Sequence, residues 1–137
     1  MVTITTPRPP LNLFEVVRTP IGPAWSPLYE VPDYLIPAVG PTPARTVGAA
    51  AIMTGLLVAN DSFADITFSV RIVGSDGINY TVLRDASVPP NDFAQIGLDR
   101  QVMRSGEVIE MRAGDGQSAV VHFTFILNQR EDFEVIT

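Results

Sequence analysis

The side chains best suited to catalysis in this sequence are one histidine, His122, and fifteen carboxylates. A serine hydrolase needs a histidine within reach of a nucleophile and held in place by a carboxylate. Ser69 and Ser118 could act as nucleophiles in principle, but neither lies in the sharp glycine-flanked turn that exposes such a serine. His122 stands between Val121 and Phe123 in a segment that alternates like a strand, so we interpret it as a structural histidine.

The carboxylates do not form a recognisable site either. Most aspartates lie in turn-like segments, where their side chains bond to nearby backbone groups. A glycosidase needs two carboxyl groups facing each other across a cleft, and a calcium loop needs closely spaced oxygen ligands. Asp61 with Asp65, and Asp115 between two glycines, are the nearest approach to such spacing. The chain has no cysteine, which excludes disulfides and thiolate metal sites. We therefore predict no enzymatic activity, no metal and no cofactor.

Charge and hydropathy point to proteins as partners. The net charge of −6 disfavours nucleic acid, because binding phosphates requires a surplus of cations. All nine basic residues are arginine, which pairs with carboxylates better than lysine does at interfaces. No stretch reaches the ~20 apolar residues of a membrane helix, and the first residues do not resemble a secretory signal. We predict no nucleic-acid partner and no membrane association.

From residue 44 onward the hydrophobic pattern has a period of two, which is typical of strands. The expected strands cover residues 52–59, 66–73, 78–84, 93–98, 102–103 and 108–113, followed by one long last strand. The inward face of that last strand is expected to consist of Ala119, Val121, Phe123, Phe125 and Leu127. Turn signals such as Asp76-Gly77 separate these segments, and none has helical periodicity. The pattern predicts an all-β fold, an antiparallel β-sandwich of jelly-roll or Ig-like type, over residues 44–127.

Ten of the twelve prolines lie in the first 43 residues. Proline fixes φ and removes a backbone donor, so no helix or central strand is expected there. The segment is nevertheless rich in apolar and aromatic residues, unlike a disordered linker. We predict an extended proline-rich N-terminal arm over residues 1–43 and a charged C-terminal tail over residues 128–137. The arm either wraps its own domain or lies across a neighbouring subunit.

If the arm contacts a neighbour, large aromatic side chains should anchor it and arginines should pair with acidic groups on the partner. The predicted interface residues are Phe14, Trp25, Tyr29, Tyr34, Arg8, Arg18, Arg45 and, in the tail, Phe133. Under this hypothesis, deletion of residues 1–28 should leave a folded sandwich that no longer joins its assembly.

Four short segments carry a resemblance to a known family. They are Tyr29-Glu30-Val31-Pro32, residues 51–60, a "VPxN"-like loop at Val88-Pro89-Pro90-Asn91, and the turn at residues 103–107, where Glu107 replaces the family's usual aspartate. Over about residues 29–127 the chain resembles small virion structural proteins of tailed bacteriophages. The resemblance implies a non-enzymatic structural role in the virion, in repeated copies at the capsid surface, neck or tail and baseplate. It also implies homo-oligomeric packing with copies of itself and other virion proteins, and no cofactor.

A binding module is the alternative hypothesis. The loops at residues 60–65, 89–92 and 114–117 are expected near the ends of the sandwich, where they could bind a receptor or a carbohydrate.

Overall fold

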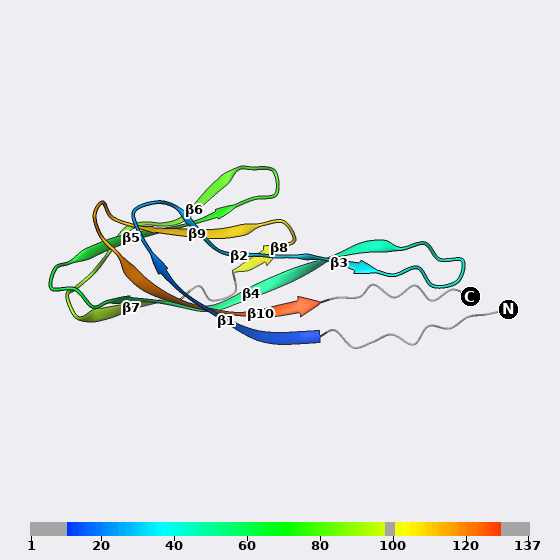
Figure 1. Ribbon diagram of the computed structural model, residues 1–137, viewed down its shortest axis with the longest axis horizontal. Helices are drawn as coiled ribbons and strands as arrows, with labels where there is room; N and C mark the ends of the chain where they lie inside the picture. The colour runs from blue at the N-terminus through cyan, green and yellow to red at the C-terminus, as the bar shows by residue number, and fades with distance from the viewer. Residues whose placement is uncertain (1–10, 98–100, 130–137) are drawn as a thin grey trace.

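The computed structural model describes residues 11–97 and 101–129, which form ten strands arranged in two antiparallel sheets (Figure 1). The strands are β1 (Leu11–Ile21), β2 (Ser26–Glu30), β3 (Asp33–Ile36), β4 (Arg45–Asn60), β5 (Ile66–Val73), β6 (Asn79–Val88), β7 (Asp92–Ile96), β8 (Val102–Arg104), β9 (Val108–Ala113) and β10 (Ala119–Gln129). The predicted all-β antiparallel sandwich is confirmed. Within the described residues, no helix is long and apolar enough to cross a membrane.

The longest strand, β4, organises the larger sheet, which we call sheet A. The strand order is β1-β10-β4-β3, and β7 and β8 also pair with β4 at different points along its length. The smaller sheet, sheet B, has the order β2-β9-β5-β6. Figure 1 shows β4 running along the molecule, with β3 towards one end and β7 towards the other.

The core lies between the two sheets and is built from alternate residues of the facing strands. The five residues expected on the inward face of β10 are all buried, at most 4% exposed, which confirms that prediction. Phe68 of β5 and Met111 of β9 face them from sheet B and are also buried. Within this core the rings of Phe123 and Phe125 stack with centroids 5.1 Å apart. Each such aromatic side chain contributes about 1.5–3 kcal/mol through burial.

The first third of the chain differs from expectation, because residues 11–36 form three strands of the sandwich. β1 pairs with β10 along its whole length, and β2 pairs with β9. Both lie at sheet edges, where Pro20 and Pro27 are tolerated because an edge strand need not donate on its outer side. The prediction that no central strand passes through this proline-rich stretch is confirmed for the described residues, although its edge strands were not predicted.

These strands also supply part of the core. Ile21, Leu28 and Val31 are at most 8% exposed. Residues 11–31 therefore pack on their own sandwich, the first of the two alternatives for the arm. Deletion of residues 1–28 would remove β1 and most of β2, so the expectation that a folded sandwich survives it needs correction. Contact between residues 1–43 and a neighbouring subunit stays a prediction.

Candidate interaction surfaces

Trp25, a predicted interface anchor, has its closest partners within the chain. The Arg71 Cζ atom lies 4.1 Å from the Trp25 ring centroid, and the Arg112 Cζ atom lies 4.7 Å from it. Arg71 in turn donates to Glu110 from both Nε and Nη2, each 2.8 Å from Oε1. This arrangement of one ring, two guanidinium groups and one carboxylate lies on the outer side of sheet B and makes that surface polar.

The other predicted interface residues are distributed over different environments. Tyr29 packs its ring 4.3 Å from that of Phe125, centroid to centroid, against the core. Phe14 is 82% exposed on β1. Tyr34 and Arg45 lie in the β3–β4 hairpin, where β3 pairs with the first residues of β4. Arg8 and Phe133 lie outside the described residues.

His122 lies on the outer side of sheet A, where Arg18 Nε donates to its Nδ1 at 3.2 Å. Ser69 belongs to sheet B and is paired with Asp85, whose backbone N–H donates to the Ser69 hydroxyl at 3.0 Å. The histidine and this serine are therefore in different sheets, which is no arrangement for nucleophilic catalysis. Across residues 11–97 and 101–129, no three histidine, aspartate or glutamate side chains gather as metal ligands.

The outer side of sheet A is unusually apolar. One cross-strand row joins Phe14, Ile126, Ile52 and Val102, which are successive register partners on β1, β10, β4 and β8. A second row joins Pro20, Val120, Ala59 and Phe93 on β1, β10, β4 and β7. We call this surface the apolar face; its outward-pointing apolar residues are Phe14, Val16, Pro20, Ile52, Leu57, Ala59, Phe93, Val102, Val120 and Ile126. Antiparallel sandwiches usually place polar residues at such positions.

The apolar face is also distinctive in its charge. Among the described outward-pointing residues of β1, β4, β7, β8 and β10 there is no carboxylate. The charged residues there are Arg18 and Arg104, which pair in register with His122 and Ala50. A carboxylate lies at the β3 edge of the same sheet, where Asp33 is exposed and pairs in register with Gly48.

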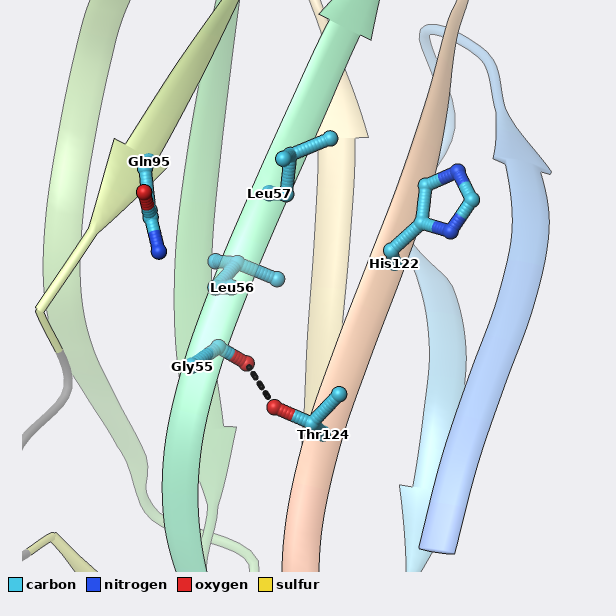
Figure 2. Close-up of a pocket in the computed structure, with 6 residues that line it drawn as sticks. All are labelled: Gly55, Leu56, Leu57, Gln95, His122 and Thr124. Atoms are coloured by element: carbon cyan, nitrogen blue, oxygen red, sulfur yellow. Dashed lines mark hydrogen bonds between the residues drawn. The ribbon is translucent and has the colours of Figure 1, made fainter.

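A shallow hollow of about 320 Å³ opens on the apolar face (Figure 2). Its lining residues are Gly55, Leu56, Leu57, Gln95, His122 and Thr124. Gly55, which has no side chain, lines the hollow next to an irregularity in the pairing of β4 with β10. Thr124 Oγ1 donates to the Gly55 carbonyl at 3.4 Å, and a Cβ at Gly55 would lie 3.2 Å from that oxygen.

Three loops meet at one end of the sandwich, as expected for the binding-module alternative. Asn60 Nδ2 donates to the Pro89 carbonyl at 3.0 Å, which ties the loop of residues 60–65 to that of residues 89–92. The Gln117 side chain donates to the Asp65 carbonyl at 3.3 Å, which joins the loop of residues 114–117 to the first. Phe63, at the tip of the first loop, is 93% exposed.

Sequence reasoning missed both Phe63 and the hollow. Phe63 was detectable as an aromatic residue within a run of turn-forming residues, Asn60-Asp61-Ser62-Phe63-Ala64-Asp65. Nothing in the sequence indicated the hollow, because Gly55 does not differ there from any other small residue within a strand.

The segments that carry the phage resemblance contact one another. The Val31 N–H donates to the Glu107 carbonyl at 3.0 Å, and the Gly106 N–H donates to the Val31 carbonyl at 2.9 Å. The Glu107 carboxylate accepts from the Arg104 N–H at 2.7 Å and so closes the turn after β8. The glutamate thus serves as a local backbone acceptor, a role open equally to an aspartate.

Comparison with known proteins adds a fold-level likeness. No protein family model matches the chain, and no curated protein matches it in sequence. A chain in the crystal structure of the T13 IBDV viral particle superposes with a TM-score of 0.51 at 11% identity, covering 87% of this chain and 31% of that one. A chain in the structure of the infectious bursal disease virus Gx strain gives 0.48 at 14% identity, covering 94% and 34%. This chain therefore spans about a third of the length of the chains it matches, and it shares the fold of part of the first.

Proposed function

We propose that this chain is a non-enzymatic structural component of a virus particle, located in the virion, where it assembles with copies of itself or with other virion proteins. The observation that carries the proposal is the apolar face, on which Phe14 is 82% exposed and Phe93 58% exposed. Exposed apolar side chains gathered on one side of a sheet mark protein interaction sites. The fold shared with a chain of the T13 IBDV viral particle supports the same conclusion.

The size of the apolar face is appropriate for an assembly contact. Six residue steps from Phe14 to Pro20 span about 20 Å, and the three spacings between four neighbouring strands span about 14 Å, so the footprint is about 300 Å². Patches of that size on monomers are commonly functional. The apolar side chains within this footprint gain ~25 cal/mol for each Å² that is covered, before the costs of association are subtracted. Arg18, His122, Thr124 and Gln95 lie between the two rows and add no such gain.

The finer part of the proposal is a place in a tailed-bacteriophage particle, as capsid decoration, neck or tail and baseplate protein. It depends on the sequence resemblance of residues 29–127. The N-terminal arm and C-terminal tail would then contact neighbours through the predicted residues other than Trp25 and Tyr29, which pack within the chain. The positions of Phe14 and Arg18 on the apolar face support this role for those two.

The direct test is the composition of the particle. We expect mass spectrometry of purified particles of the encoding virus to detect this chain in many copies, and immunogold labelling to locate it on the capsid, neck or tail. Absence of the chain from purified particles would refute the proposal. Labelling of a particle without a tail would refute only the finer placement.

The joined loops favour one second candidate function, a receptor- or carbohydrate-binding module. Loops clustered at one end of a sandwich are a common recognition site, and the exposed Phe63 ring could stack on a sugar. A glycan array tests this directly, and a calcium-dependent rise in melting temperature tests its metal-dependent form. Lack of binding in both experiments would remove this candidate.

A further inference from the structure

We propose that the loop of residues 61–65 in one copy of this chain docks into the hollow at Gly55 on the apolar face of a second copy, with the Phe63 ring as the inserted group. The proposal rests on the proposed assembly role and names the contact through which copies associate. It is carried by three observations: the Phe63 ring is exposed on an ordered loop, the hollow is partly apolar, and the residues around the ring and the hollow have opposite charges.

The Phe63 ring is exposed on a loop that hydrogen bonds hold in one conformation. Phe63 is 93% exposed, although the loop that carries it is well ordered by hydrogen bonds. The buried Asn60 side chain accepts from the Ser62 N–H at 3.0 Å and from its hydroxyl at 2.6 Å, and it donates to the Ala64 carbonyl at 2.8 Å. The backbone on both sides of Phe63 is thus fixed from one buried residue. A preorganised loop loses little entropy on binding, and exposed aromatic anchors of this kind dominate interface energetics.

The hollow offers this ring a partly apolar site. Leu57 lines it on β4, and His122, Thr124 and Gln95 flank it from β10 and β7 (Figure 2), whereas Leu56 is 1% exposed and belongs to the core. Phe93 and the other residues of the apolar face surround it, so a docked loop would also cover exposed apolar surface. Phe63 does not occupy its own hollow, since it is almost fully exposed.

Charge complementarity favours this loop as the occupant. Asp61 and Asp65 stand on either side of Phe63, and both are exposed. The apolar face has no carboxylate among its described outward-pointing residues and carries Arg18 and Arg104. Docking of the loop on the apolar face of a second copy therefore brings aspartates close to arginines. Contact between two apolar faces would instead bring arginines close to arginines.

The contact is heterologous, because it joins two different surfaces of the same chain. Each copy that inserts its Phe63 ring still has a free hollow for the next copy. Such contacts generate closed rings or extended arrays, which is the arrangement expected of a protein present in repeated copies.

Sedimentation of the purified full chain at rising concentration tests the proposal. We expect the wild type to associate below about 1 mM, and Phe63→Ser, which removes the ring, to weaken association by about 30-fold or more. Leu57→Glu, which places a carboxylate in the hollow, should have the same effect.

Ile78→Ser is the matched control, since Ile78 is an exposed apolar residue, 54% accessible, outside the apolar face. This variant should associate like the wild type. Should Leu57→Glu fail to fold by circular dichroism, Gln95→Glu introduces the carboxylate at an exposed position of β7.

Mixing the variants distinguishes the proposed contact from its alternatives. Phe63→Ser retains the hollow and Leu57→Glu retains the ring, so an equimolar mixture should form one-to-one dimers and stop there. A face-to-face dimer would be broken by Leu57→Glu, unaffected by Phe63→Ser and not rescued by mixing, and that result would overturn the proposal. A wild type that stays monomeric, or that associates unchanged after Phe63→Ser, would also overturn it. None of these results would alter the particle composition that tests the virion role.

Discussion

Asn60 Nδ2 donates a hydrogen bond to the carbonyl oxygen of Ala64 at 2.8 Å, across the turn that follows β4. The same amide reaches the carbonyl oxygens of Val88 and Pro89 at 3.2 and 3.0 Å, so one side chain connects β4 to the end of β6 and the loop after it. Asn60 is 2% exposed, and water cannot readily replace it there. It therefore both stabilises the sandwich and orients the Phe63 loop.

Asn60→Ala should lower the free energy of unfolding by about 2–4 kcal/mol, because it leaves several buried or half-buried polar groups without their partner. Urea denaturation followed by circular dichroism measures the change. Asn60→Asp is the matched variant: it keeps an oxygen acceptor for Ser62 but loses the amide donor, and it should also destabilise. A loss below about 0.5 kcal/mol in Asn60→Ala, typical of an ordinary surface substitution, would contradict this role.

Trp25→Ala should destabilise the chain by about 1–3 kcal/mol, because it removes the ring that Arg71 and Arg112 cover. Thermal unfolding followed by circular dichroism is the suitable measurement, since Trp25 is the sole tryptophan and fluorescence is lost with it. Trp25→Phe retains an aromatic ring and should lose less stability. Equal stability of the alanine variant and the wild type would mean that the two arginine contacts contribute nothing to the fold.

Gly114→Ala should destabilise the turn between β9 and β10. A Cβ at Gly114 would lie 2.5 Å from Gln117 Oε1 and 2.6 Å from Thr67 Oγ1. Gln117 Oε1 accepts the Thr67 N–H at 2.8 Å, so moving that side chain away breaks a hydrogen bond. We expect a loss of about 1–3 kcal/mol in denaturant unfolding. Gly22→Ala is the control, since nothing lies within 4 Å of a Cβ there, and it should be near neutral.

Deletion of residues 1–28 should unfold the protein or leave it partly folded. The deletion removes β1, which pairs with β10 at eleven positions, together with the buried side chains of Ile21 and Leu28. Loss of each such side chain alone costs about 2–5 kcal/mol, a large share of the stability of a small domain. Circular dichroism and proteolysis measure the outcome. A cooperative unfolding transition like that of the full chain would show that residues 1–28 are dispensable for the fold.

Local patterns in the sequence were enough to predict much of the sandwich. β5 and β9 begin and end at the predicted residues, and the inward face of β10 is as expected. Period-two alternation is set by strand geometry alone, so it can be read without knowledge of the partner strand. The same reasoning placed the loops at residues 60–65, 89–92 and 114–117 between strands, except that Asn60 is the last residue of β4 and Asp92 the first of β7.

The strands of the proline-rich segment could not be predicted in this way. Whether a proline fits a strand depends on which side of that strand is paired, and β1 is paired only with β10, about a hundred residues further along the chain. The extra length of β4, which was expected over residues 52–59, has a similar origin, because its first residues pair with β3. Long-range pairing thus decided which prolines lie within strands.

The sequence by itself determined that this chain is an acidic, cysteine-free β-protein with an inward apolar face on each main strand, because composition and alternation are local properties. Only the tertiary structure decided that outward residues of β1, β10, β4, β7 and β8 form two apolar rows on one face, on either side of Arg18, His122, Thr124 and Gln95, and that the Phe63 ring stays outside the core. Both follow from strand order and cross-strand register, which bring together residues such as Phe14, Ile126 and Ile52. Contacts between residues so distant in sequence are set by the packing of the whole sandwich.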